Sequence, residues 1–158
     1  MMENSLRILS DSLDKKMDVL RKIQNYNREQ EKAFTEGRAD LEAFDRAIEE
    51  KDALIEELMK LDDGFEALFD RISGEFKENK QAYAPQIAIL QKKISEITEF
   101  SMSIQAQEAR NKKLVEEFFS KERSRLGNER KGSKAAYDYY KSMSGGGMNV
   151  SRFMDQKN

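Results

Sequence analysis

Residues 85–130 read PQIAILQKKISEITEFSMSIQAQEARNKKLVEEFFSKERSRLGNER and carry the longest uninterrupted helical pattern in the chain. Apolar side chains recur there at spacings of three and four residues, at Ile87, Leu90, Ile94, Ile97, Ile104, Val115 and Phe118. This heptad places a narrow apolar seam along one helix, and such a seam needs a partner helix. At ~1.5 Å per residue, the helix would be about 65 Å long.

Three polar residues share this seam: Ser101, Glu108 and Asn111. One interpretation is that they are half-buried, with polar ends that reach water and stems that pack, because a polar core position often sets the register of a coiled coil. The other is that the seam opens there to receive a polar partner. The spacing alone is compatible with both.

The composition of the 158 residues restricts both the fold and the chemistry. Charged residues make up 37% and hydrophobic residues 38%, and Pro occurs once, which is typical of long two-faced helices in a single domain with or without a tail. The chain contains no Cys and no His, so thiol nucleophiles, Ser/His/Asp triads, zinc sites and disulfides are excluded. We therefore expect no cofactor and no metal.

Charge and hydropathy also bear on location and partners. The first residues lack a sustained apolar run, so we expect neither a secretory signal nor a membrane span. We therefore expect a soluble cytoplasmic protein. The net charge of −2 argues against a nucleic-acid partner, which requires a broad basic face. The charge is unevenly distributed: residues 36–66 contain twelve acids and four bases, and residues 121–134 contain six bases and two acids. These two segments would attract each other or face different partners.

The first helix is expected over residues 5–35, with Ser5 as its N-cap. Lys15 and Lys16 fall largely off its apolar side, which consists of Leu6, Leu9, Leu13, Met17, Leu20, Ile23, Tyr26 and Phe34. Gly37 then suits a left-handed C-cap, and Asp40 suits the N-cap of the next helix. Because the turn is short, the first two helices should be antiparallel.

The second helix is expected over residues 40–80. Gly64 weakens it by about 1 kcal/mol relative to Ala, so a bend or soft point is expected there and not a break. The aromatic group Phe65, Phe69, Phe76 and Tyr83 is interpreted as part of the core. Pro85 fits the first turn of the third helix, over residues 85–130, although a kinked continuous helix is the alternative.

The sequence thus predicts an all-α fold: an antiparallel bundle of three long helices with coiled-coil-like packing over residues 1–131. Residues 132–158 are expected to form a flexible tail, because they contain Gly132, Gly145–Gly147 and several Ser residues. The tail also carries two short adhesive segments with Tyr137, Tyr139, Tyr140, Met143, Met148, Val150, Phe153 and Met154. These segments either order on contact with a partner or dock on the chain's own bundle.

The segment GRADLEAFDRAIEEKDALIEELMKL, residues 37–61, resembles the flagellar export chaperones of the FlgN-like family. That family tends to have a long first helix, a break of the form Gly-x-x-Asp-Leu-x-x-Leu and an acidic-Lys-x-x-Leu element. Here these elements are Gly37, Asp40 with Leu41, Phe44 in place of the usual aliphatic residue, and Glu50, Lys51 and Leu54. The stretches IQAQEARNKKL (104–114) and RFMDQKN (152–158) also resemble family members.

The resemblance implies a cytoplasmic chaperone of type III flagellar export. Its clients would be hook-filament junction (hook-associated) proteins, whose terminal helices must be shielded before delivery to the export gate. An apolar surface can accept such a helix, and a few buried anchors at roughly 1.5–3 kcal/mol each suffice for micromolar binding. The residues expected to bind the client lie at the end of the third helix and in the tail: Ile104, Leu114, Val115, Phe118, Phe119, Leu126, Tyr137, Tyr140, Met143, Val150, Phe153 and Met154.

Other classes of protein are alternatives to this interpretation. A homodimeric coiled-coil scaffold would need a strict seam in every helix, and a related chaperone for the filament-cap protein or flagellin has the same composition. An enzyme is not expected, because carboxylate pairs such as Glu49 with Glu50 are adjacent on helices and do not converge. Glu96 and Glu99 share a face but lack the His of a di-iron bundle.

Overall fold

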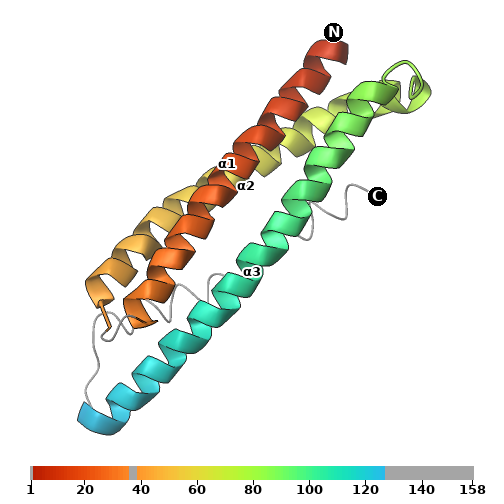
Figure 1. Cartoon of the computed structure of the whole chain (residues 1–158). Coiled ribbons are helices and arrows are strands. Elements are labelled where there is room, and N and C mark those ends of the chain that lie inside the picture. The colour runs from red at the N-terminus through yellow and green to blue at the C-terminus, as the bar shows by residue number, and fades with distance from the viewer. Residues whose placement is uncertain (1, 36–38, 127–158) are drawn as a thin grey trace.

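The computed structural model describes residues 2–35 and 39–126, apart from the side chains of residues 123–126. These residues form three helices and no strand: α1 (Met2–Thr35), α2 (Leu41–Glu78) and α3 (Ala84–Leu126). The chain runs along α1, returns along α2 and runs back along α3, so α2 is antiparallel to the other two helices (Figure 1). The predicted all-α bundle of three long helices is confirmed.

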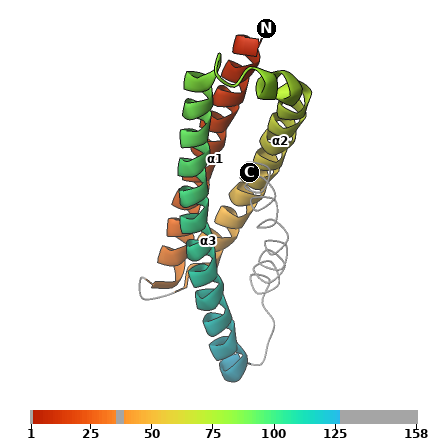
Figure 2. The same ribbon diagram turned by 90° about the vertical axis from the view of Figure 1, so that its right-hand side faces the viewer.

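Helix α1 is the central element of the bundle. It packs against both α2 and α3, whereas no Cα atom of α2 lies within 8 Å of a Cα atom of α3 in the described part of the chain. Polar pairs fix the register: Lys16 of α1 contacts Asp62 of α2 at 2.6 Å, and Asn111 of α3 donates to the Asn27 carbonyl of α1 at 2.9 Å. The turn that joins α2 to α3 lies at the end of the bundle where α1 begins (Figure 2).

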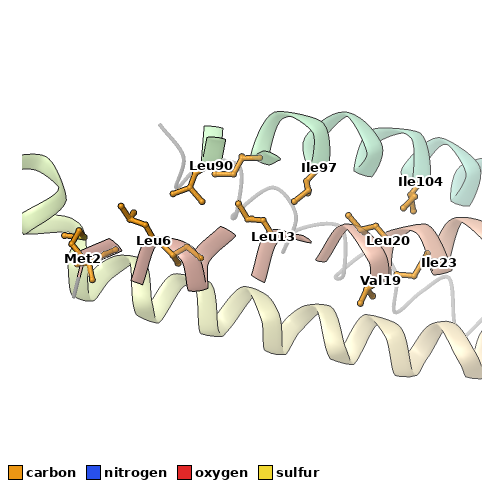
Figure 3. Close-up of a cluster of buried hydrophobic side chains, with 12 residues drawn as sticks. Met2, Leu6, Leu13, Val19, Leu20, Ile23, Leu90, Ile97 and Ile104 are labelled. Atoms are coloured by element: carbon orange, nitrogen blue, oxygen red, sulfur yellow. The ribbon is translucent and has the colours of Figure 1, made fainter. Parts of the chain in front are cut away.

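The main hydrophobic core lies along the seam that α1 presents to its two neighbours. Leu6, Leu13 and Leu20 of α1 lie between the other helices, and Leu90, Ile97 and Ile104 of α3 point towards them (Figure 3). The heptad of α3 is therefore confirmed, since four of its residues belong to this cluster: Leu90, Ile94, Ile97 and Ile104. The aromatic group predicted to be core packs against the cluster as half-buried side chains: Phe65, Phe69, Phe76 and Tyr83.

Local sequence signals explain where α2 and α3 begin. The Asp40 carboxylate accepts a hydrogen bond from the Ala43 backbone N–H at 3.0 Å, so this residue caps α2 as predicted. Helix α3 begins at Ala84, which places Pro85 in the first turn, where its missing N–H costs nothing. Helix α2 continues through Gly64 without a break, also as predicted.

Two expectations for α1 are wrong. The helix begins at Met2, so Ser5 lies inside it and is not its N-cap. The physical reason is tertiary: Met2 is buried in the main core, and this packing extends the helix towards the start of the chain. Lys16 does not lie off the packed side but is buried, because Asp62 of α2 supplies a carboxylate partner that the α1 sequence alone does not show.

The last turns of α3 extend past the connection between α1 and α2 (Figures 1 and 2). Gly37, proposed as a C-cap, and the predicted tail lie outside the described residues. Most of the basic segment 121–134 also lies outside them, so its expected attraction to the acidic helix remains a prediction. The bundle thus presents one helix end without α1 or α2 beside it.

Candidate functional site

Six polar side chains form a buried layer across the three helices, which we call the polar layer: Asn27, Gln30, Lys51, Gln107, Glu108 and Asn111. The Lys51 side chain is 0% exposed and forms an ion pair with Glu108. Its Nζ also donates to Gln30 Oε1 at 2.8 Å, and Asn27 donates to Gln107 Oε1 at 3.3 Å. The Lys51–Glu108 pair is a direct polar bridge from α2 to α3.

The polar seam residues of α3 differ from both interpretations of their spacing. Ser101, Glu108 and Asn111 are buried, so their polar ends do not reach water as the first interpretation expects. Nor does the seam await an outside polar partner at Glu108 and Asn111, because Lys51 of α2 and Asn27 of α1 already contact these two side chains. The seam is therefore paired within the bundle at Glu108 and Asn111, whereas the buried Ser101 hydroxyl has no hydrogen-bond partner among the described residues.

The polar layer separates two apolar clusters. The larger extends from Met2 to Ile23 of α1 and includes Ile104 of α3. The smaller consists of Ala33, Phe44, Ile48 and Val115, with Phe34, Ile55 and Phe119 packed against it. Because an unpaired buried charge is costly, shifting α2 or α3 by one turn would break the Lys51–Glu108 pair, and the pair thereby fixes the axial alignment of these two helices.

The stability of the fold is expected to depend on pH through Lys51. Burial lowers the pKa of this side chain from 10.5 to about 8, although the Glu108 and Asp52 carboxylates oppose the shift. Between these values the unfolded chain binds more protons than the folded chain, so the free energy of unfolding rises with pH, by up to about 1.4 kcal/mol per pH unit. Urea unfolding of the unmodified chain and of Lys51→Met at pH 8 and pH 10 tests this prediction. The other titratable groups are common to both proteins, so the difference between their pH dependences reports on Lys51. Equal pH dependence in the two proteins would contradict the assignment.

The residues predicted to bind a client occupy two different environments. Ile104 is 7% exposed and Val115 is 3% exposed, and each belongs to one of the apolar clusters. A client reaches these two side chains only by displacing the helices that cover them. In contrast, Leu114, Phe118 and Phe119 are half-buried near the end of the bundle.

Four phenylalanines, which we call the aromatic end, gather where α1 stops, α2 starts and α3 continues. The Phe34 ring lies 5.0 Å from the Phe44 ring and 5.3 Å from the Phe118 ring, centroid to centroid. The Phe118 and Phe119 centroids are 5.2 Å apart. As adjacent residues on a helix, these two diverge: Phe118 contacts the Phe34 ring of α1, and Phe119 packs on the small cluster, to which all three helices contribute.

The remaining predicted residues are not placed. Leu126 lies in the last turn of α3, but its side chain is outside the described residues. The tail residues are outside them entirely: Tyr137, Tyr140, Met143, Val150, Phe153 and Met154. The structure therefore brings Phe118 and Phe119 together with Phe34 and Phe44. The role of the seven residues that are not placed stays a prediction.

Sequence reasoning missed most of the polar layer. Lys16, Asn27 and Gln30 continue the spacing of Leu9, Leu13, Leu20 and Ile23 along α1, and this continuation is the signal that could have found them. Along α2, the exposed Lys60 lies off the apolar side, whereas Lys51 continues the spacing of Phe44, Ile48, Ile55 and Leu58. Its role depends on Glu108, which is distant in sequence.

The chain matches the family model described as "FlgN protein" over residues 1–140. No curated protein and no solved structure matches it. None of the helices in residues 2–35 and 39–126 has the length and apolarity needed to cross a bilayer. Across the same ranges, no cluster of acidic residues has the arrangement of a metal site.

Proposed function

Because this chain belongs to the FlgN protein family, a family of flagellar export chaperones, we propose that it binds and shields the terminal helices of hook-filament junction proteins before export. In this proposal the chain acts in the cytoplasm, keeps its client unassembled and delivers it to the export gate. The observation that carries the proposal is the family match over residues 1–140.

The geometry supports a client surface at the aromatic end. Phe118 and Phe119 are half-buried there, beside a helix end that extends past α1 and α2. An amphipathic client helix would cover these rings and gain roughly 1.5–3 kcal/mol for each well-buried anchor. The proposed surface consists of Leu114, Phe118, Phe119 and Leu126, together with the tail residues Tyr137, Tyr140, Met143, Val150, Phe153 and Met154. Ile104 and Val115 join it only if the client opens the bundle.

Truncation after residue 131 tests the proposal. The truncated chain is expected to keep its helical circular dichroism, because the described core lies within residues 2–126. Its affinity for the hook-filament junction proteins of the same organism should fall by about tenfold, the loss of one well-buried anchor, as measured by isothermal titration calorimetry. Ile89→Ser in the full chain is the matched control, since Ile89 is an exposed apolar residue of α3 away from the aromatic end.

The possible results have distinct meanings. Full affinity in the truncated chain would place the client surface on the helices alone. If the full chain binds no junction protein but binds the filament-cap protein or flagellin, the proposed client is wrong and the chaperone class stands. A stable homodimer that binds none of these proteins would favour a coiled-coil scaffold.

A further inference from the structure

A largely apolar groove, which we call the α1–α2 groove, lies between α1 and α2 and has a volume of about 350 Å³. Leu61, Phe65 and Leu68 of α2 line it as half-buried side chains, and Ile8 and Ser12 of α1 line the opposite side. This volume is at the lower end of the range for ligand pockets in proteins. The groove therefore suits a few side chains and not a whole helix.

The apolar part of the α1–α2 groove is open to water. Ile8 is 51% exposed and belongs to neither apolar cluster. A Cβ atom added at Gly64 would contact nothing within 4 Å outside its own stretch of helix, so the α2 backbone leaves free space there. Apolar side chains placed beside Ile8 and over Gly64 would remove apolar surface from water, which is favourable.

Charged side chains lie at one end of the groove. The contact between Lys16 and Asp62 aligns the two helices so that the exposed Lys15 and Lys60 share this end. Asp11 lies one helical turn from Lys15. The ion pairs found among the described residues include neither of the two exposed lysines nor Asp11. An occupant with a carboxylate and a cation on either side of apolar side chains would match these charges.

The C-terminal sequence contains this combination. Residues 152–155 read Arg-Phe-Met-Asp, so two apolar side chains lie between a cation and a carboxylate. Residues 137–141 read Tyr-Asp-Tyr-Tyr-Lys and also combine apolar groups with both charges. Both segments lie outside the described residues, and both are tethered to the end of α3. The length of each tether decides which segment can reach the groove.

The register of α1 and α3 gives the distance that the tether has to span. Asn111 of α3 contacts Asn27 of α1, and the two helices run in the same direction (Figure 1). Leu126 ends α3 about 22 Å beyond this contact, whereas Ser12, in the groove, lies about 22 Å before it on α1. The groove therefore lies about 45 Å from the end of α3 along the bundle.

Only the later segment spans this distance. At about 3.3–3.6 Å per extended residue, Asp138 reaches at most about 43 Å from Leu126, which is too short even for a fully extended chain. Phe153 reaches up to about 90 Å, which leaves length for the path around the bundle. Gly145–Gly147 precede it and permit a change of chain direction.

We infer that the α1–α2 groove binds residues 152–155 of its own chain. Phe153 and Met154 occupy the apolar part, and the Asp155 carboxylate lies beside the two exposed lysines. Weak contacts suffice, because a flexible tether holds the segment at an effective concentration in roughly the millimolar range. The inference goes beyond the proposed function and does not depend on it, although a client that binds Phe153 and Met154 would compete with the groove.

Disulfide formation tests the contact, because the chain has no Cys of its own. One variant combines Ser12→Cys, in the groove, with Gln156→Cys, next to the proposed segment. The control replaces Ser12→Cys by Ser95→Cys, an exposed position of α3 at about the same level of the bundle. During mild air oxidation of the full chain, the groove pair is expected to close at least about tenfold faster than the control pair, as measured by intact mass spectrometry.

Two results of this experiment would overturn the inference. Equal rates for the two pairs would mean that the segment does not prefer the groove. A groove pair that closes only between two chains, with a product of twice the mass and a rate that depends on protein concentration, would make a second copy of the chain the occupant.

Charge reversal tests the role of the exposed lysines, with each rate divided by that of the control pair carrying the same substitution. Asp155→Lys should slow closure of the groove pair by about tenfold, whereas Asp138→Lys makes the same change in net charge outside the segment and should change the rate less than about twofold. Adding Lys15→Glu and Lys60→Glu to Asp155→Lys should restore most of the rate. Equal slowing by the two Asp→Lys variants, or no recovery after the reversal, would overturn the inference.

Discussion

Lys51→Met is expected to lower the free energy of unfolding by about 3–5 kcal/mol, because it removes the cation that pairs with a buried carboxylate. The Lys51 side chain is 0% exposed, and its ion pair with Glu108 bridges α2 and α3. Urea unfolding followed by circular dichroism measures the change. The exposed Lys60→Met is the control for charge and side-chain length and should change stability by less than about 0.5 kcal/mol.

The double variant Lys51→Met, Glu108→Leu separates the charge pair from packing. Replacing both partners by apolar side chains of similar volume is often neutral or stabilising, so this variant should recover most of the loss. A double variant as unstable as Lys51→Met would show that the site depends on side-chain shape rather than on pairing. A loss below about 1 kcal/mol in Lys51→Met itself would mean that the pair is open to water in solution.

Phe44→Ala is expected to cost about 3–5 kcal/mol, through lost transfer free energy and the cavity left behind. The Phe44 ring is 0% exposed and packs edge-on against Phe34 in the small apolar cluster. Thermal and urea unfolding measure the change. Phe44→Leu introduces an aliphatic side chain, the kind that the resemblance to the FlgN-like family leads us to expect at this position. It should lower the free energy of unfolding by less than about 1.5 kcal/mol if the cluster repacks.

Hydrogen exchange shows which part of the fold Phe44→Ala destabilises. Because the polar layer separates the small cluster from the main core, Phe44→Ala should raise hydrogen exchange mainly around the end of α1 and the start of α2. Met59→Ala, at a largely exposed position of α2, is the size control and should have little effect. Uniform loosening of all three helices would show that the two clusters unfold as one unit.

The sequence predicted much of the candidate surface, but it did not predict which of these residues are exposed. The pattern around Phe118 and Phe119 indicated that adjacent rings cannot share one seam, and in the structure Phe118 contacts the Phe34 ring whereas Phe119 packs on the small cluster. The same pattern did not reveal that Ile104 and Val115 are covered, because burial depends on where α1 and α2 stop.

The sequence by itself determined the helices, since heptad spacing, the Asp40 cap and the position of Pro85 are properties of short stretches of chain. Only the tertiary structure decided that α1 is central, that Met2 extends it, and that Lys16 and Lys51 are buried. A local pattern specifies which face of a helix is apolar. Whether a lysine on that face is tolerated depends on a carboxylate from another helix, which the spacing within one helix does not encode.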